Sequence, residues 1–97
     1  MYNIVNNKET NRFEVTDLPG TAILDYEWSG DSLVLVHTFV SESLRGKGLA
    51  QELAAFAMEY IKSHHYKAII KCPYVASYLK HHPEYNPLVI ATIANKE

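Results

Sequence analysis

Two glycines separated by a single residue, Gly46 and Gly48, limit this chain more than any other feature of its sequence. Residues 33–40 before them are apolar at almost every position and predict a strand covered on both faces. From Leu49 onward, apolar residues recur at helical spacing and predict a long helix. Since glycine lacks a Cβ atom, the backbone of such a turn can approach a ligand closely, beside the unpaired first N–H groups of the helix. The turn therefore predicts a binding site for an anion.

Positive side chains beside the two glycines favour a phosphate group as that anion. Arg45 and Lys47 add positive charge to the turn, and the N–H groups and dipole at the N-terminus of a helix also attract anions. The residues expected to hold the phosphate are Arg45, Gly46, Lys47, Gly48, Leu49 and Ala50. The alternative is that the glycines only form a tight corner between strand and helix.

Two common phosphate-binding motifs do not fit this turn. A Walker loop has Ser or Thr after its lysine, whereas Gly48 follows Lys47. A dinucleotide fingerprint has a third glycine where Gln51 stands, and too few strand–helix units remain for a doubly wound sheet. Both classes of site are excluded.

The order of strand-like and helix-like segments predicts the fold class. Strands are expected at residues 3–5, 12–16, 22–29, 33–40 and 66–72, a second short helix at about 75–81, and an apolar run at 88–93 that fits a last strand or a helix. Gly30 and Asp31 match a two-residue hairpin turn, which makes the strands beside it antiparallel. The strand, long helix and strand that follow predict a parallel pair. We expect an α/β (α+β) fold with a mixed, mostly antiparallel sheet, in one domain spanning residues 1–97.

Composition excludes several classes of partner. The chain has 97 residues and a formal net charge of -2, so it lacks the excess of Lys and Arg that a nucleic-acid partner requires. No run reaches the ~18 apolar residues of a membrane span, and the first residues do not form a signal peptide. The single cysteine, Cys72, cannot form an internal disulfide and suits a reducing compartment. We expect a cytoplasmic protein that binds neither nucleic acid nor membrane.

The segment around the glycine turn, residues 39–53, closely resembles the acetyl-CoA motif of the GNAT superfamily of N-acetyltransferases. The resemblance extends from Leu33 to about Pro87. The later segment, residues 72–85, looks like a small single-domain branch of that superfamily, in which a cysteine follows the fifth strand and leads into Pro-Tyr and a short helix.

This resemblance implies acetyl-CoA as the small-molecule acyl donor and a GNAT-like sheet that splays between its fourth and fifth strands. The pantetheine arm would lie in that gap, with backbone hydrogen bonds to Phe39 and Val40, and residues 45–50 would hold the pyrophosphate. Ser43 departs from the Gln or Arg of larger members. The two helices that usually follow the first strand are absent, so the amine that accepts the acetyl group remains unidentified.

Three residues are candidates for the chemistry. Cys72 follows a strand at the end where open α/β sheets gather ligands, and a thiolate there could accept the acetyl group. His37 shares the predicted strand face of Leu33 and Leu35 and could deprotonate the amine or the Cys72 thiol. The alternatives are a buried cysteine that fills space and a hydrogen-bonded core histidine.

Tyr78 is the third candidate, as the acid that protonates the departing CoA thiolate. It lies in the region where GNAT members place a tyrosine, although matching Ala76 to their helix alanine puts Lys80 at the tyrosine position. The adjacent pairs His64–His65 and His81–His82 lack a Cys or carboxylate to complete a ligand set, so no metal is expected.

The leading hypothesis is an acetyl-CoA-dependent N-acetyltransferase with Cys72 as one route for the acetyl group. One alternative is a CoA-binding module with little or no transferase activity. Another is a protein-interaction domain of the same fold, with Tyr74, Tyr78 and Tyr85 as exposed aromatic anchors.

Overall fold

A computed structural model of the protein describes residues 2–93 and has the predicted α/β architecture. Its elements in chain order are β1 (Ile4–Asn7), β2 (Arg12–Val15), β3 (Ala22–Ser29), β4 (Ser32–Val40), η1 (Glu42–Leu44), α1 (Leu49–Ser63), β5 (Lys67–Ile70), α2 (Pro73–Lys80), η2 (Pro83–Leu88) and β6 (Val89–Thr92). The predicted long helix is confirmed, and the apolar run at 88–93, which fitted a strand or a helix, contains the strand β6. Helix α2 starts at Pro73, two residues before its predicted start, because proline suits the first position of a helix.

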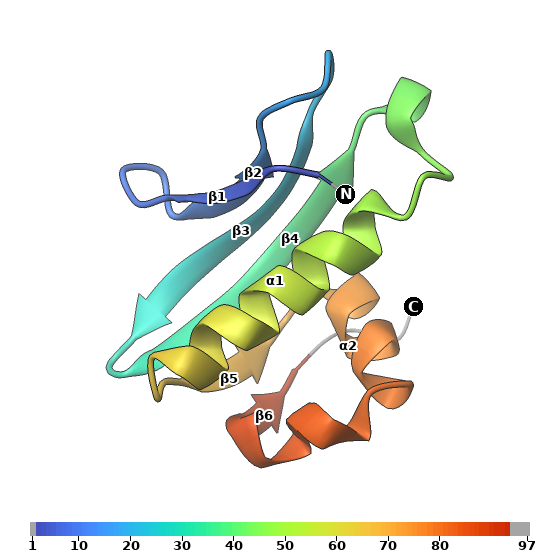
Figure 1. The fold of residues 1–97 in the computed structure, drawn as a ribbon. Helices are drawn as coiled ribbons and strands as arrows, with labels where there is room; N and C mark the ends of the chain where they lie inside the picture. The colour runs from blue at the N-terminus through green and yellow to red at the C-terminus, as the bar shows by residue number, and fades with distance from the viewer. Residues whose placement is uncertain (1, 94–97) are drawn as a thin grey trace.

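The six strands form one sheet in which they lie side by side in chain order (Figure 1). Strands β1 to β4 pair antiparallel, whereas β5 is parallel to β4 and β6 is parallel to β5. The predicted mixed, mostly antiparallel sheet is therefore confirmed. The long crossover through α1 is what allows the parallel pairing of β4 and β5.

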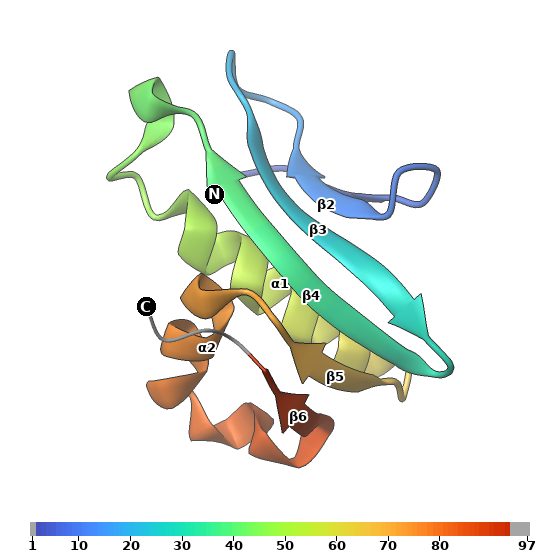
Figure 2. The same ribbon diagram turned by 180° about the vertical axis from the view of Figure 1, so that it is seen from behind.

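Helix α1 packs across one face of the sheet and forms the core with it. Its apolar stripe buries residues that include Leu49, Leu53 and Ile61, which join Phe13 and other strand residues in one hydrophobic cluster. Burial of this stripe is the main stabilising contribution to a helix in a protein of this size. Within residues 2–93, no helix covers the other face of the sheet, which Figure 2 shows in front of α1.

A bulge in β4 reverses the predicted facing of its second half. Asp25 pairs with His37 while the next residue, Tyr26, pairs with Leu35, so Val36 is an extra residue without a partner on β3. Because side chains alternate along a strand, one extra residue moves every later side chain to the other face. His37 is therefore on the open face of the sheet and is exposed, and the prediction that it shares the face of Leu35 is wrong.

The pairing of β4 with β5 stops halfway along β4. Its last pair is Leu35 with Ile70, and the N–H groups of Lys71 and Cys72 both donate to the carbonyl of Leu35 at 2.9 Å. Beyond this point β4 continues to Val40 while the chain after β5 turns into α2. We call the space between the second half of β4 and the start of α2 the fork.

Candidate functional site

Both glycines of the turn have a left-handed backbone conformation. Gly46 and Gly48 have φ angles of 84° and 79°, which residues with a Cβ atom rarely adopt. Gly48 is the N-cap of α1 and provides no side-chain cap, and Glu52 N–H makes a helical bond to the carbonyl of Gly48 at 3.1 Å. The N–H groups of the helix that precede Glu52 lack helical partners, so they can bind a ligand.

Leu44, at the end of η1, fixes the turn against the sheet. It is 5% exposed, and a Cβ atom built on Gly20 would lie only 2.8 Å from its Cδ1. Gly20 thus allows the loop between β2 and β3 to approach η1 closely. Leu44 thus anchors the turn in the core, while no atom lies within 4 Å of a Cβ atom built on Gly46.

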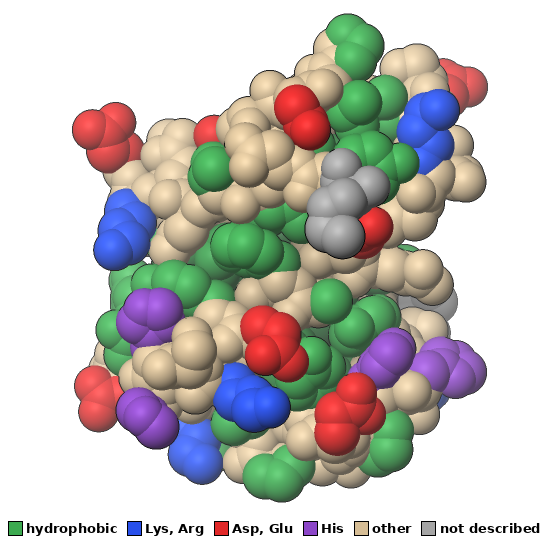
Figure 3. Space-filling view, in the orientation of Figure 1, with side chains coloured by type: hydrophobic (Ala, Val, Ile, Leu, Met, Phe, Trp, Pro, Cys, Tyr) green, Lys and Arg blue, Asp and Glu red, His purple; other side chains and the backbone are tan. Residues whose placement is uncertain are grey.

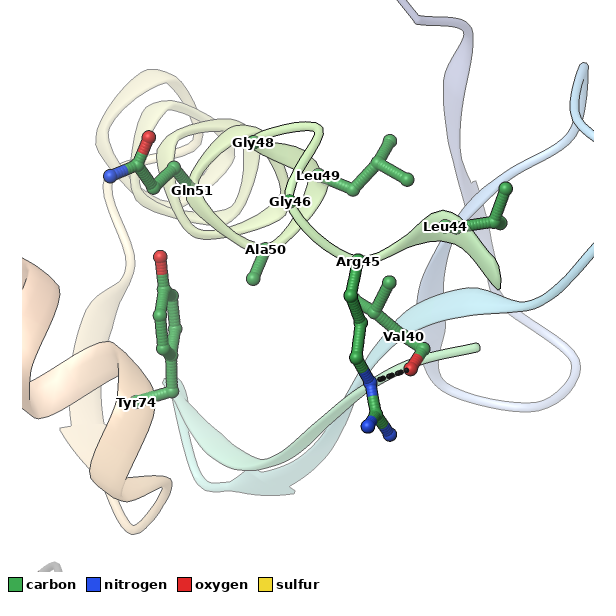
Figure 4. Close-up of a pocket in the computed structure, with 9 residues that line it drawn as sticks. All are labelled: Val40, Leu44, Arg45, Gly46, Gly48, Leu49, Ala50, Gln51 and Tyr74. Atoms are coloured by element: carbon green, nitrogen blue, oxygen red, sulfur yellow. Dashed lines mark hydrogen bonds between the residues drawn. The ribbon is translucent and has the colours of Figure 1, made fainter. Parts of the chain in front are cut away.

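A hollow of about 350 Å³ lies in front of the turn (Figure 4). Its walls come from the end of β4, the turn itself, the first turn of α1, and α2. The residues that line it are Val40, Leu44, Arg45, Gly46, Gly48, Leu49, Ala50, Gln51 and Tyr74. The structure thus brings six of the eight predicted cofactor residues to one hollow, and the two that do not line it are Phe39 and Lys47.

The end of β4 presents alternate backbone groups to the fork. Ser41 N–H donates to Thr21 O at 2.7 Å, so the backbone of Ser41 faces β3. Because a strand alternates its bonding edges, the backbone groups of Val40 and Thr38 face the fork and those of Phe39 face β3. The geometry therefore favours Thr38 and Val40, in place of Phe39 and Val40, for backbone hydrogen bonds to a ligand.

Arg45 lies beside the end of β4, at the mouth of the fork. Its Nε donates to the carbonyl oxygen of Val40 at 3.0 Å, as Figure 4 shows. Lys47 does not line the hollow, and its carbonyl accepts a hydrogen bond from the Tyr2 hydroxyl at 3.4 Å. The two cations of the turn are therefore not equivalent, because only Arg45 lines the hollow.

Cys72 lies at the inner end of the fork. It is the N-cap of α2 and is 3% exposed, among the apolar residues of the core. Its Sγ lies 3.2 Å from Oγ1 of Thr38, a residue that the sequence did not single out. The bulge that exposes His37 is also what turns Thr38 toward the helix side, where it meets Cys72.

His37 and Cys72 do not act as a pair in this geometry. His37 is exposed on the open face of the sheet, with Asp25 as its cross-strand neighbour. Cys72 lies on the helix side, and no hydrogen bond joins the two within residues 2–93. Of the two roles predicted for His37, only deprotonation of an amine on the open face fits its position.

Tyrosine side chains of α2 divide between the hollow and the core. Tyr78 stacks on His82, with ring centroids 4.2 Å apart, and does not line the hollow. Tyr74 does, and its ring points from α2 toward Ala50 and Gln51 (Figure 4). Burial raises the pKa of the Tyr74 phenol above 10, and negative charge on Cys72 raises it further, so the phenol keeps its proton at neutral pH. The sequence signal that could have pointed to Tyr74 as a site residue is its position directly after Cys72 and Pro73.

The histidine pairs occupy helix ends. Figure 3 shows the histidines of this face in two separate groups. Nδ1 of His64 lies 3.0 Å from the carbonyl of Tyr60 near the C-terminus of α1, and its ring stacks on that tyrosine. Residues 2–93 contain no cluster of three or more His, Cys, Asp or Glu residues suited to a metal ion. No helix in this part of the chain has the length and apolar character to cross a membrane.

Comparison with protein families gives one match that covers most of the chain. The family model described as GCN5-related N-acetyl-transferase matches residues 12–88. This range includes β2 to η2 and therefore the glycine turn, the fork and α2.

Relatives and a solved structure agree with this match. Protein NATD1 of Xenopus tropicalis is 40% identical over 63 residues, which are 64% of this chain and 58% of that protein. Protein NATD1 of Homo sapiens is 38% identical over 63 residues, which are 64% of this chain and 56% of that protein. The matched region thus spans less than two thirds of these relatives. A GCN5-like protein of Staphylococcus aureus, solved by NMR, shares the fold with a TM-score of 0.70 at 20% identity, covering 99% of this chain and 92% of that one.

Proposed function

The chain belongs to the family of GCN5-related N-acetyltransferases, and from this premise we propose that it binds acetyl-CoA and transfers the acetyl group to an amine. The observation that carries the proposal is the hollow that adjoins the mouth of the fork in front of the N-terminus of α1. The uncapped N–H groups of α1 suit a pyrophosphate. Nothing lies within 4 Å of a Cβ atom built on Gly46, so the turn leaves room for a ligand.

The fork suits the pantetheine arm. Thr38 and Val40 direct backbone groups into it, as a strand does toward a neighbouring strand. Arg45 stands between this strand and the phosphate turn, where its guanidinium can contact a phosphate oxygen. An arm that enters past Arg45 and runs along β4 leads its thioester toward Cys72.

We propose that Cys72 accepts the acetyl group before the amine does. The Cys72 thiol first loses its proton to solvent. The thiolate then attacks the thioester carbon, a new C–S bond forms, and the bond to the CoA sulfur breaks. CoA leaves as a thiolate and takes a proton from Tyr74, which then regains one from solvent. Location at the N-terminus of α2 supports the thiolate, since helix N-termini stabilise negative charge.

The amine then takes the acetyl group from Cys72. Its nitrogen attacks the acetyl carbon, the C–N bond forms, and Cys72 leaves as a thiolate, while the nitrogen gives up its proton. We propose His37 as the acceptor of that proton for an amine that enters the fork from the open face of the sheet, where the His37 side chain lies. Tyr78 remains a candidate acid, although Tyr74 is better placed beside the hollow.

The structure does not favour the interaction-domain alternative. Of its three proposed aromatic anchors, Tyr85 is buried and Tyr78 is half-buried against His82. A CoA-binding module with little activity remains the competing proposal. A cytoplasmic location and the absence of nucleic-acid or membrane partners also remain predictions.

The test combines calorimetry with mass spectrometry of the intact protein. We expect acetyl-CoA to bind and one acetyl group to appear on the protein, removable by hydroxylamine and absent from the Cys72→Ala variant. Binding without this adduct, together with unchanged turnover by Cys72→Ala, would remove the role of Cys72. Binding with no transfer to any amine would favour the CoA-binding module, and no binding at all would overturn the whole proposal.

A further inference from the structure

A polar contact crosses the fork at the point where the acetyl group would be transferred. The contact joins Oγ1 of Thr38 on β4 and Sγ of Cys72 at the N-terminus of α2, 3.2 Å apart. We propose that Thr38 is a positioning residue for Cys72: its hydroxyl donates a hydrogen bond to the Cys72 thiolate and holds the sulfur in the fork. This inference rests on the proposed role of Cys72.

The position of Thr38 is a consequence of the β4 bulge. Before the bulge, the helix-side residues of β4 are Leu33 and Leu35, which are both fully buried. After the extra residue Val36, the helix-side positions are Thr38 and Val40. Thr38 therefore brings a hydroxyl group into a row that is otherwise apolar, and this hydroxyl lies beside the sulfur.

The sulfur has few other sources of a hydrogen bond. Cys72 is 3% exposed, so water reaches its side chain poorly, and a buried anion is costly without donors. The N–H groups of Lys71 and Cys72 both donate to Leu35 O. Within residues 2–93, Thr38 is the hydrogen-bond partner that the structure gives to this sulfur.

A threonine hydroxyl suits both protonation states of the thiol. It can accept from the S–H group, and after a rotation about its C–O bond it can donate to the thiolate. The heavy atoms need not move between the two states. The sulfur is therefore held in one place before and after it loses its proton.

The first test measures the thiol without any CoA. Cys72 is the only cysteine, so alkylation by iodoacetamide reports on it alone. We compare Thr38→Val, which removes the hydroxyl at nearly constant shape, with Thr38→Ser, which keeps it. Thr10→Val is the matched control, because Thr10 lies in the turn between β1 and β2.

The measured quantity is the pH at which the alkylation rate reaches half its plateau. In Thr38→Val we expect this midpoint to rise by about 0.5–1 pH unit, the effect of one lost hydrogen bond. Thr38→Ser and Thr10→Val should keep the parent's midpoint. If the substitution only made the sulfur more accessible, the plateau rate would change and the midpoint would stay the same. An unchanged midpoint in Thr38→Val would therefore overturn the proposal. Thr38→Ala provides the same comparison if valine disturbs folding.

The second test adds saturating acetyl-CoA and follows the acetyl group on Cys72. We expect acetylation of Thr38→Val to be about threefold to tenfold slower, with CoA affinity unchanged and the rate restored in Thr38→Ser. Equal acetylation rates in the parent and Thr38→Val would count against the proposal. If the midpoint shifts but even the parent is never acetylated, Thr38 still holds the thiolate and the proposed acyl-enzyme is wrong.

Discussion

At the scale of single residues, three glycines share a left-handed backbone conformation but differ in what lies in front of them. Gly30, Gly46 and Gly48 have φ angles of 60°, 84° and 79°. No atom lies closer than 4.0 Å to a Cβ atom built on any of them, so a side chain there would cost backbone strain rather than a clash. Gly46 and Gly48 line the hollow, whereas Gly30 forms the turn between β3 and β4.

This difference makes Gly30→Val a matched control for Gly48→Val. Each variant should lose about 1–2 kcal/mol in the free energy of unfolding, because each forces a β-branched residue into a left-handed conformation. Gly48→Val alone should also lose CoA binding, since its side chain would stand where the phosphate meets the helix N–H groups. Urea unfolding and calorimetry measure the two effects. Equal CoA affinity in both variants would show that the phosphate does not bind at this turn.

The two cations of the turn provide a second residue-scale prediction. Arg45→Ala should weaken CoA binding about tenfold, because a guanidinium that lines the hollow can make a charge-assisted hydrogen bond to phosphate. Lys47→Ala removes the same charge from a residue outside the hollow and should change the affinity much less. Pantetheine, which lacks the pyrophosphate, should bind both variants equally. An equal loss for CoA and pantetheine in Arg45→Ala would assign Arg45 a structural role.

At the scale of elements, a part-buried hydrogen bond joins η2 to α1. The Tyr85 hydroxyl donates to Oε2 of Glu59 at 2.7 Å, and Tyr85 is 7% exposed. Burial raises the pKa of the Tyr85 phenol well above its usual value of 10, and the hydrogen bond to the Glu59 carboxylate raises it further. The folded protein therefore binds this proton more tightly than the unfolded chain does.

This shift predicts how stability depends on pH. The contribution of Tyr85 is fully present below about pH 10 and is lost as the pH rises through the higher pKa of the folded state. Tyr85→Phe should lower the free energy of unfolding by about 1 kcal/mol at pH 8. Its stability should also fall less steeply than the parent's between about pH 10 and 11.

Urea unfolding across this pH range provides the measurement. Tyr2→Phe is the control, because it also removes one phenol hydrogen bond. The acceptor of that bond is the Lys47 carbonyl at 3.4 Å and not a carboxylate. A Tyr85→Phe variant that follows the parent's alkaline curve would contradict the assignment.

The elements themselves were largely predictable from the sequence, but the facing of β4 was not. Apolar spacing predicted α1, and the strand–helix–strand order predicted the parallel pair. The bulge at Val36 depends on how β3 and β4 pair, and a bulge leaves no residue pattern in a strand that is apolar almost throughout. For this reason His37 was placed on the wrong face and Thr38 was overlooked.

The site was predictable where it depends on local backbone and less so where it depends on tertiary placement. Gly46 and Gly48 between a strand and a helix predicted a turn, and the structure has one there with positive φ angles, which glycine readily adopts. Tyr74 and Tyr78 are one helical turn apart, and only the packing of α2 against α1 decides which one reaches the hollow. Cys72 was located at its strand end by sequence, but its contact with Thr38 requires the fork.

At the scale of the whole molecule, we propose that residues 1–97 fold as a single domain. Fluorescence can report on one end of the molecule alone, because the only tryptophan is Trp28. Trp28 lies near the C-terminal end of β3, with its ring centroid 5.0 Å from that of Tyr66. The hollow is lined by Val40 at the other end of the β3–β4 hairpin, and Figure 1 shows that end of β4 far from the turn between β3 and β4. Thermal unfolding followed by circular dichroism and by Trp28 fluorescence should give one common midpoint.

Ligand binding should stabilise both ends together. CoA at a hundredfold excess over its dissociation constant should raise the free energy of unfolding by about 2.7 kcal/mol in both signals. A shift confined to circular dichroism, with the Trp28 transition unmoved, would mean that the sheet end and the hollow belong to separate cooperative units.

The fork has a consequence for solubility. A strand with unpaired backbone groups is an adhesive edge that can recruit strands of other chains and start aggregation. The second half of β4 is such an edge, but two contacts lie along it. Arg45 donates a hydrogen bond to the carbonyl of Val40, and the Thr38 hydroxyl contacts the Cys72 sulfur. A strand of another chain, with its side chains, would have to displace both contacts, whereas the narrow, flexible pantetheine arm can pass beside them. The pantetheine arm would thus pair with β4 as a seventh strand would. Until CoA binds, the two contacts would keep strands of other proteins from pairing with this part of β4.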